Sequence, residues 1–162
     1  MCVSVYRGES SGVLFDDFDR RKTNAGVGFF FAEAIGLART YAKAGTPVRE
    51  FSLTPERVLD LTDVYACEPL QFILRYSLEF DAWVDRYSGE CSSSATPWLE
   101  SGMLYDYEGT GSGTRWNALF RLAEDEGYDA VRVIDHTDGG EGEPIVWVIF
   151  DPDKVKFQAL HP

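Results

Sequence analysis

The sequence is poor in the residues that build disulfide frameworks and structural zinc sites. Its 162 residues include three cysteines (Cys2, Cys67 and Cys91) and two histidines (His136 and His161). The cysteines are odd in number and widely spaced, with no C-x-x-C pair, which argues against both kinds of site. We therefore expect reduced thiols and no bound metal. His136 is the plausible partner if one of the thiols were a nucleophile.

Long apolar runs are also missing. No stretch approaches the roughly 18 apolar residues that span a bilayer, and the opening residues, MCVSVYRGESS, lack the basic and apolar regions of a signal peptide. These absences predict a cytoplasmic protein without a membrane partner.

Basic residues are few as well. The chain has 15 Lys and Arg against 27 Asp and Glu, a formal charge of −12. Such a charge repels phosphate backbones and anionic membranes, so nucleic acid is not an expected partner. A basic protein surface remains compatible with it.

Hydrophobic residues make up 44% of the sequence and aromatic residues 14%. This content is enough for one core, which predicts one domain over residues 1–162. Alternating or β-rich segments predict strands at residues 3–6, 28–32, 48–53, 130–134, 145–150 and 154–160. Helical spacing and capping signals predict helices at residues 34–44, 69–87 and 114–127, a further helix start at residues 54–57 and a short turn around residues 15–18. Together these predict an α+β fold. Residues 63–113 are expected to form a variable insertion, with a mobile lid at residues 91–113.

A first candidate site is Tyr6-Arg7-Gly8, at the end of the first expected strand. Arginine offers a fixed, charged fork for a phosphate or carboxylate, and glycine lets a ligand approach the backbone. The alternative is a surface salt bridge to one of the many acidic residues.

A second candidate is the segment from Gly26 to Tyr41, in which Gly28 precedes three phenylalanines. Strand alternation sends Phe29 and Phe31 to one face and Phe30 to the other. One face can be core while the other lines a cleft, and Tyr41 on the following helix can turn a second ring toward it. Plain core packing is the alternative.

A third candidate is the loop at residues 135–143, which holds four carboxylates. A solvated hairpin loop explains it simply. A carboxylate at a strand end can also stabilise positive charge at a sugar carbon when a glycosidic bond breaks. Asp135, directly after its strand, is the better placed, and Glu143 is second.

In this order the pieces resemble the ADP-ribosyltransferase superfamily, in the branch with diphtheria toxin and the poly(ADP-ribose) polymerases. GVGFFFA at residues 26–32, followed by Ala38 and Tyr41, looks like the family's G-x-G-[IF]-Y-F-A strand and the helix after it. The resemblance implies that Phe30 and Tyr41 take the places of two tyrosines that sandwich nicotinamide. It also implies split β-sheets with flanking helices and a central NAD cleft.

The first and last motifs extend the resemblance. Val5-Tyr6-Arg7-Gly8 looks like the motif whose arginine anchors NAD and whose glycine backbone holds the nicotinamide amide. The segments GYDAV at residues 127–131 and WVIFDPDKVK at residues 147–156 are similar to the endings of compact phage and bacterial members, among them polyvalent-protein and anti-CRISPR transferase domains. Tyr6, Arg7, Gly8, Gly28, Phe30, Phe31 and Tyr41 are thereby expected to bind NAD.

One departure concerns catalysis. Where the polymerases carry their catalytic glutamate, this chain has Val146. In compact phage members an acidic residue at the end of the preceding strand serves, and Asp135 matches that place. The resemblance therefore implies a mono-ADP-ribosyltransferase with Asp135 and Arg7 as catalytic residues, NAD as substrate and a host protein in the host cytosol as acceptor. The alternatives are a catalytically silent interaction protein and an NAD glycohydrolase toxin.

Overall fold

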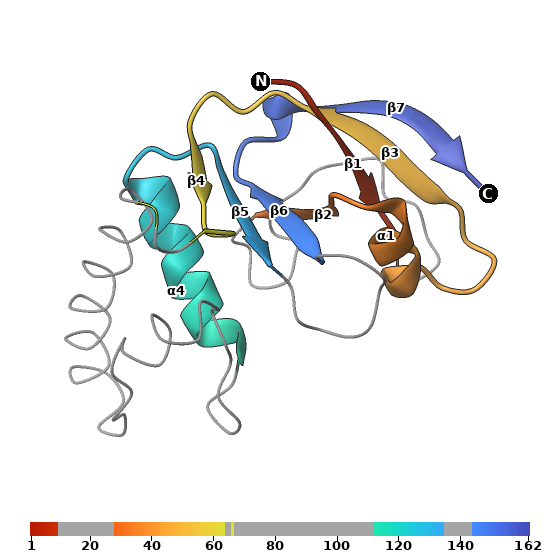
Figure 1. Cartoon of the computed structure of the whole chain (residues 1–162), viewed down its shortest axis with the longest axis horizontal. Helices are drawn as coiled ribbons and strands as arrows, with labels where there is room; N and C mark the ends of the chain where they lie inside the picture. The colour runs from red at the N-terminus through yellow and green to blue at the C-terminus, as the bar shows by residue number, and fades with distance from the viewer. Residues whose placement is uncertain (10–27, 64–65, 67–111, 135–143) are drawn as a thin grey trace.

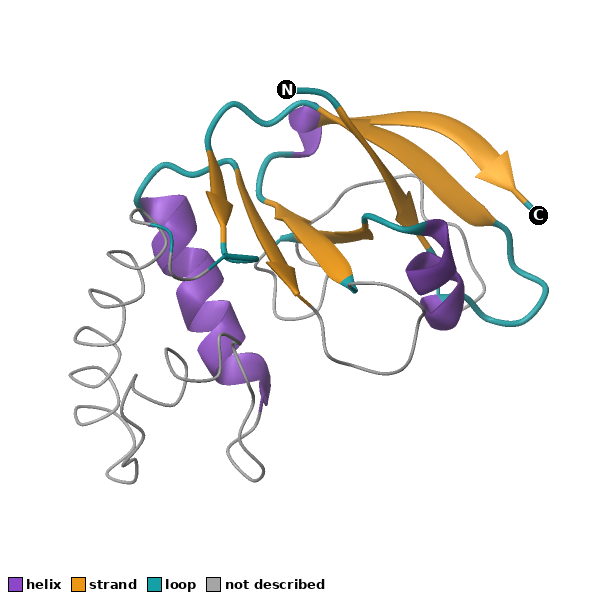
Figure 2. Cartoon of the chain, viewed as in Figure 1, coloured by secondary structure: helices purple, strands orange, loops and turns teal. Residues whose placement is uncertain are grey.

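The structure, a computed structural model, describes residues 1–9, 28–63, 66, 112–134 and 144–162 (Figure 1). Its elements are β1 (Val3–Arg7), β2 (Phe29–Ala32), α1 (Ile35–Tyr41), β3 (Val48–Leu53), β4 (Val58–Asp60), α4 (Ser112–Asp125), β5 (Ala130–Ile134), β6 (Ile145–Ile149), the 3-10 turn η3 (Pro152–Lys154) and β7 (Val155–His161). Strands and helices alternate irregularly around one sheet, so the predicted α+β class is confirmed (Figure 2).

The seven strands follow the order β4-β5-β6-β2-β1-β3-β7, and β4–β5 is the parallel pair of an otherwise antiparallel sheet. Its ladders are uneven. All five residues of β1 pair with β3, whereas β1 and β2 are joined by a single register pair, Tyr6 with Ala32. Two well-paired parts, β4-β5-β6-β2 and β1-β3-β7, therefore meet at one point.

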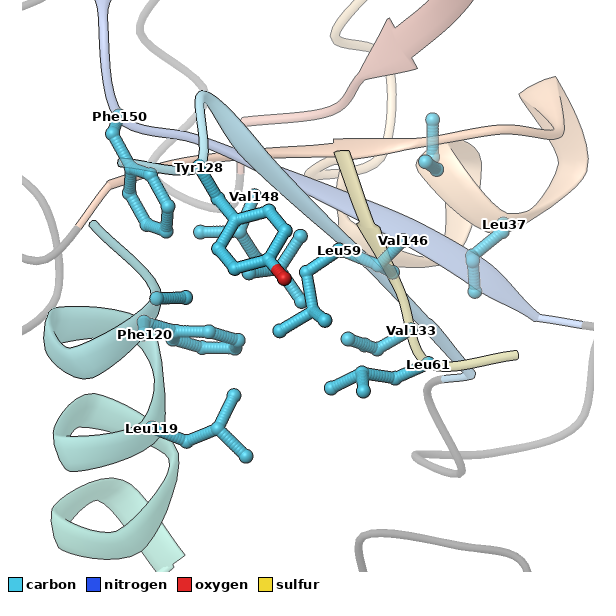
Figure 3. Packing of buried hydrophobic residues seen from close by; sticks show 14 of the residues in the cluster. Leu37, Leu59, Leu61, Leu119, Phe120, Tyr128, Val133, Val146, Val148 and Phe150 are labelled. Atoms are coloured by element: carbon cyan, nitrogen blue, oxygen red, sulfur yellow. The ribbon is translucent and has the colours of Figure 1, made fainter. Parts of the chain in front are cut away.

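Alternation of side chains gives the sheet two apolar faces. On the face that carries α1 and α4, Leu119 and Phe120 of α4 pack over Val133 and Val148 of the sheet (Figure 3). The opposite face holds a second cluster made of Val5, Phe29, Phe31, Phe51, Leu53, Ala130, Trp147 and Ile149. Large side chains buried this fully each stabilise the fold by roughly 1.5–3 kcal/mol.

The predicted strands are confirmed to within about a residue at each end. The helix predicted at residues 34–44 is shorter, because Ala42 is already extended, with φ −76° and ψ 139°. The helix predicted to end at Gly127 is confirmed as α4. Gly127 has φ +81°, and the Tyr128 N–H donates to the Ala123 carbonyl at 3.0 Å, the glycine-based ending that helices favour.

The helix start predicted at residues 54–57 is wrong. The Glu56 and Arg57 N–H groups donate to the Asp129 carboxylate, at 2.7 and 2.9 Å, so an acceptor distant in sequence takes the amides that a helix cap would have satisfied. The chain then enters β4, where buried Leu59 pairs with Val131 of β5. Burial in the sheet outweighed the local capping signal.

Several predictions lie outside the described residues: the turn at residues 15–18, the helix at residues 69–87 and most of the insertion at residues 63–113. The single-domain prediction stays a prediction. In the part of the chain that is described, no helix is long and apolar enough to cross a membrane.

Candidate functional site

The point where the two parts of the sheet meet brings the first two candidate motifs together. Beyond the Tyr6–Ala32 pair, β1 continues into Arg7 and Gly8, and Gly8 lies against the end of α1. A Cβ on Gly8 would sit 2.1 Å from the Ala38 carbonyl oxygen and 2.7 Å from the Ala42 nitrogen, so only glycine fits. The end of β1 is thus fixed beside the last turn of the helix that carries Tyr41.

Close packing against β6 also explains why position 28 is a glycine. A Cβ there would lie 2.8 Å from Val148 Cγ1 and 3.0 Å from the Ile149 carbonyl oxygen of β6. The glycine that opens the aromatic motif therefore lets β2 lie close against β6. A contact of Gly28 with NAD stays a prediction.

The three phenylalanines of the motif divide as alternation predicted. Phe29 and Phe31 are 1% exposed and belong to the core of the face opposite α1 and α4, whereas Phe30 is 38% exposed on the other face. In the described part of the chain, the Phe30 ring contacts Phe120 of α4 edge-to-face, with centroids 5.8 Å apart. Tyr41 is 37% exposed. The core interpretation thus holds for Phe29 and Phe31, and a slot between Phe30 and Tyr41 stays a prediction.

Arg7 lies on the same face as Phe31, with its guanidinium 5.9 Å from the ring centroid. Its Nε donates to Glu9 Oε1 at 2.9 Å. The same oxygen accepts from Nη2 of Arg49, a residue 4% exposed that packs 5.3 Å from the Phe51 ring. We call Arg7, Glu9 and Arg49 the Arg7 cluster. Arg7 thus forms the salt bridge that was the alternative to ligand binding, through its Nε. Its partner is a buried carboxylate and not a surface one.

Tyr6 points to the helical face. It packs against the core there and meets His161 of β7 edge-to-face, with centroids 5.8 Å apart. His161 Nε2 in turn lies 2.7 Å from Glu50 Oε2. A contact of Tyr6 with NAD stays a prediction.

A second cluster of charged residues was not predicted from the sequence. Arg132 on β5 donates from Nε and Nη2 to Glu33, at 2.9 and 3.2 Å, and from Nη1 to Asp60 at 3.0 Å. Thr62 Oγ1 accepts a further bond from Nη1, and Trp147 Nε1 donates to Glu33 at 2.9 Å. We call these five residues the Arg132 cluster. A charged residue at position 132, inside the apolar segment AVRVI, was the signal for a buried partner.

Both carboxyls of the Arg132 cluster are held ionised. Hydrogen bonding from Arg132 lowers the pKa of Glu33, against the effect of burial and with help from Trp147. Burial raises the pKa of Asp60, but hydrogen bonds from Thr62 and Arg132 outweigh it, and the pKa is lowered overall. The pKa of Arg132 is raised, mainly by its hydrogen bonds to Glu33.

The two clusters lie in one row across the sheet. Asp60 pairs with Arg132, Arg132 with Trp147, and Trp147 with Phe31. On the other side of the junction, Arg7, which packs on Phe31, pairs with Arg49. A continuous line of arginine and aromatic side chains therefore crosses the sheet on the face opposite α1 and α4.

The structure describes one of the three positions considered for a catalytic carboxylate, that of Val146. Val146 is 6% exposed, pairs with Ala32 and packs in the helical-face core (Figure 3). Asp135 and Glu143 lie outside the described residues. Their roles stay predictions.

No group of three His, Cys, Asp or Glu side chains among the described residues could hold an ion. Metal-free chemistry remains the expectation from the sequence.

Comparison with known proteins gives one likeness of fold. No family model matches the chain, and no curated protein matches it. Among solved structures, the chain is similar to one described as "Crystal structure of an anti-CRISPR protein", with a TM-score of 0.56 and 12% identity over 98% of this chain and 95% of that one. At this identity the likeness concerns the fold, and it extends over nearly the full length of both chains.

Proposed function

We propose that this protein is a mono-ADP-ribosyltransferase that cleaves NAD and transfers ADP-ribose to a host protein. The observation that carries the proposal is the junction of β1 and β2. There the strand ending in Arg7 and Gly8 lies against the helix that carries Tyr41, and β2 exposes Phe30 on the same face of the sheet as that helix. These are the elements that the sequence resemblance assigns to NAD.

The residues have distinct roles in the proposed reaction. Phe30 and Tyr41, on the helical face, hold the nicotinamide ring, each aromatic contact contributing on the order of 1 kcal/mol beyond burial. Arg7, whose side chain lies on the opposite face at the end of β1, binds the diphosphate, so NAD has to pass the strand end at the junction. The bond between nicotinamide and ribose breaks, and nicotinamide leaves neutral with the bonding electrons. Asp135 stabilises the cationic sugar carbon, which the acceptor attacks as it loses a proton.

An acceptor assay tests the reaction. Labelled NAD is incubated with the protein and a lysate of the host. Label transfer by the natural protein and its loss in Asp135→Ala support the proposal. Asp138→Ala, with the same charge change in the same loop, is the matched control and retains transfer. Equal transfer by the natural protein and Asp135→Ala removes Asp135 from the mechanism.

A binding assay tests the aromatic pair. Phe30→Ala weakens NAD affinity about tenfold and costs only about 1 kcal/mol of stability, because the side chain is partly exposed. Phe157→Ala is the matched control, since Phe157 meets Phe51 with the centroid distance of 5.8 Å and angle of 73° that Phe30 makes with Phe120. If Phe30→Ala lowered stability without changing NAD affinity, Phe30 would have a packing role and no role in binding.

A specific observation favours a second candidate, a catalytically silent protein that uses this fold to block a partner. Val146, at the usual glutamate position, is buried among apolar side chains. The fold likeness to an anti-CRISPR protein supports a phage-derived effector in either case. Complex formation with a host protein, without NAD binding or nicotinamide release, would favour this candidate. Free ADP-ribose without labelled protein would instead indicate an NAD glycohydrolase.

A further inference from the structure

Glu33, the residue that follows β2, is bonded to both β5 and β6. Its two carboxylate oxygens accept from Nε and Nη2 of Arg132 on β5, at 2.9 and 3.2 Å. One of these oxygens also accepts from Nε1 of Trp147 on β6, at 2.9 Å. The Glu33 backbone N–H donates to the Ile145 carbonyl, also on β6, at 2.9 Å. A single residue thus ties the end of β2 to two other strands.

These bonds lie close to where β5 ends and β6 begins. Ile134, the last residue of β5, pairs with Ile145, the first residue of β6. Arg132 pairs with Trp147 two residues further into the strands. Because both of these side chains bond to one carboxylate, the strand ends cannot separate there without breaking charge-assisted hydrogen bonds. In the sequence, Asp135 comes directly after Ile134.

Asp60, the other carboxylate on Arg132, connects different elements. It accepts from Nη1 of Arg132 at 3.0 Å, and from the Thr62 N–H and hydroxyl at 3.0 and 2.6 Å. Asp60 ends β4, which pairs with β5 on the side away from β6. The two carboxylates therefore share one guanidinium, but Asp60 joins β5 to β4 and Glu33 joins β5 to β6.

We infer that Glu33 is a positioning residue for the proposed transferase reaction. It holds the ends of β5 and β6 together and so fixes the point at which the chain continues into Asp135. The inference rests on the proposed function, in which Asp135 stabilises the cationic sugar carbon. The Glu33 carboxylate bonds to Trp147 on the face opposite α1 and α4, whereas Phe30 is exposed on the helical face. Glu33 thus acts through the strands and not by contact with the nicotinamide ring.

This role affects catalysis more than stability. The side chains of Arg132 and Glu33 are 22% and 35% exposed, and a partly solvated ion pair contributes little to the free energy of unfolding. A displacement of about 1 Å in a catalytic constellation can lower the rate about a hundredfold. The value of kcat is therefore the sensitive measurement.

The test compares Glu33→Ala with Asp60→Ala, each of which removes one carboxylate from Arg132. Initial rates of nicotinamide release are measured over a range of NAD concentrations with the host lysate present, well below the unfolding temperature of each variant. We expect Glu33→Ala to lower kcat about tenfold or more, with KM for NAD within about threefold of the natural value. Asp60→Ala keeps both values within about twofold.

Amide hydrogen exchange measures the positioning separately from catalysis. Glu33→Ala speeds exchange in peptides that contain Ile134 and Ile145, more than Asp60→Ala does, because the strand ends open more often. Glu33→Gln keeps one carboxamide oxygen as an acceptor, so its effects on exchange and on kcat are in the same direction and smaller. It carries the test if Glu33→Ala fails to fold, as judged by thermal unfolding.

The outcomes are distinct. Faster exchange at the strand ends with a lower kcat in Glu33→Ala, and neither in Asp60→Ala, supports the inference. Equal exchange in the two variants, equal losses of kcat, or faster exchange with unchanged kcat overturns it while the proposed function stands. A natural protein that releases no nicotinamide removes the proposed function, and the catalytic role of Glu33 with it.

Discussion

The Arg7 and Arg132 clusters occupy one row on one face of the sheet, on opposite sides of the junction between β1 and β2. Each arginine packs near an aromatic ring, Arg7 by Phe31 and Arg132 by Trp147, both at 5.9 Å. The two clusters differ in the number of carboxylates that contact the arginine. Arg132 bonds to two carboxylates, which between them accept from all three of its nitrogens, whereas Arg7 shares one carboxylate with Arg49.

The comparison leads to an expectation: the surroundings of an arginine, and not its residue type, decide whether it serves stability or binding. A guanidinium that donates from all three nitrogens to neighbouring segments links them together. Within the described residues Arg7 is bonded through Nε, and under the proposed function its guanidinium binds an anion. Four substitutions or titrations probe this difference, from the largest expected effect to the smallest.

Phe31→Ala removes the ring that lies between the two arginines in the row. Phe31 is 1% exposed, and truncation of a buried phenylalanine leaves a cavity, so we expect a loss of about 4 kcal/mol in the free energy of unfolding. Denaturant titration measures it. Phe157→Ala, at 52% exposure, costs less than about 1 kcal/mol. Similar losses for the two variants would contradict the burial of Phe31.

Arg132→Met leaves Glu33 and Asp60 without their shared cation. We expect a loss of about 2 kcal/mol, below the figure for a fully buried ion pair because the cluster is partly solvated. Urea unfolding at neutral pH measures it. A loss below about 0.5 kcal/mol would show that the cluster has no structural role.

Arg7→Met has the opposite balance of effects. Among the described residues Arg7 makes one side-chain hydrogen bond, to Glu9, which predicts a stability loss below about 1 kcal/mol. NAD affinity, measured in the same preparation, falls by at least about tenfold if Arg7 binds the diphosphate. A large stability loss with unchanged affinity would make the two arginines equivalent.

Acid titration gives the smallest effect. The pKa values of Glu33 and Asp60 are lowered in the folded protein from ordinary values of 4.5 and 3.8. Their stabilisation is therefore present above those values and is lost as pH falls through the lower folded pKa values, by about 1 kcal/mol or less after allowance for solvent. Unfolding at pH 7 and pH 3 measures it. Arg132→Met reduces this dependence, and an unchanged slope would contradict the assignment.

Local patterns predicted most of the described fold. Alternation located the strands and assigned Phe30 to the face opposite Phe29 and Phe31, because side-chain direction in a strand depends only on neighbouring residues. The helix start at residues 54–57 failed because Asp129, 72 residues from Arg57, supplies the acceptor. A local signal cannot anticipate a competing partner from another strand.

The same reason explains what was missed around the candidate site. Arg7 and Gly8 were identified from their place at a strand end, but Arg49 is 40 residues from Glu9, and Arg132 is 99 residues from Glu33. These partners are set by strand register. Register depends on how the whole sheet assembles, so neither cluster could be derived from spacing along the chain.

The single register pair between β1 and β2 has a consequence for how the chain assembles. The strands β1, β3 and β7 lie on one side of it and β2, β4, β5 and β6 on the other. Along the chain, the path crosses the junction from β1 to β2, from β2 to β3, from β3 to β4 and from β6 to β7. Neither side is a contiguous piece of polypeptide, so neither can be isolated by truncation. Such interleaving raises contact order, so we expect slow folding.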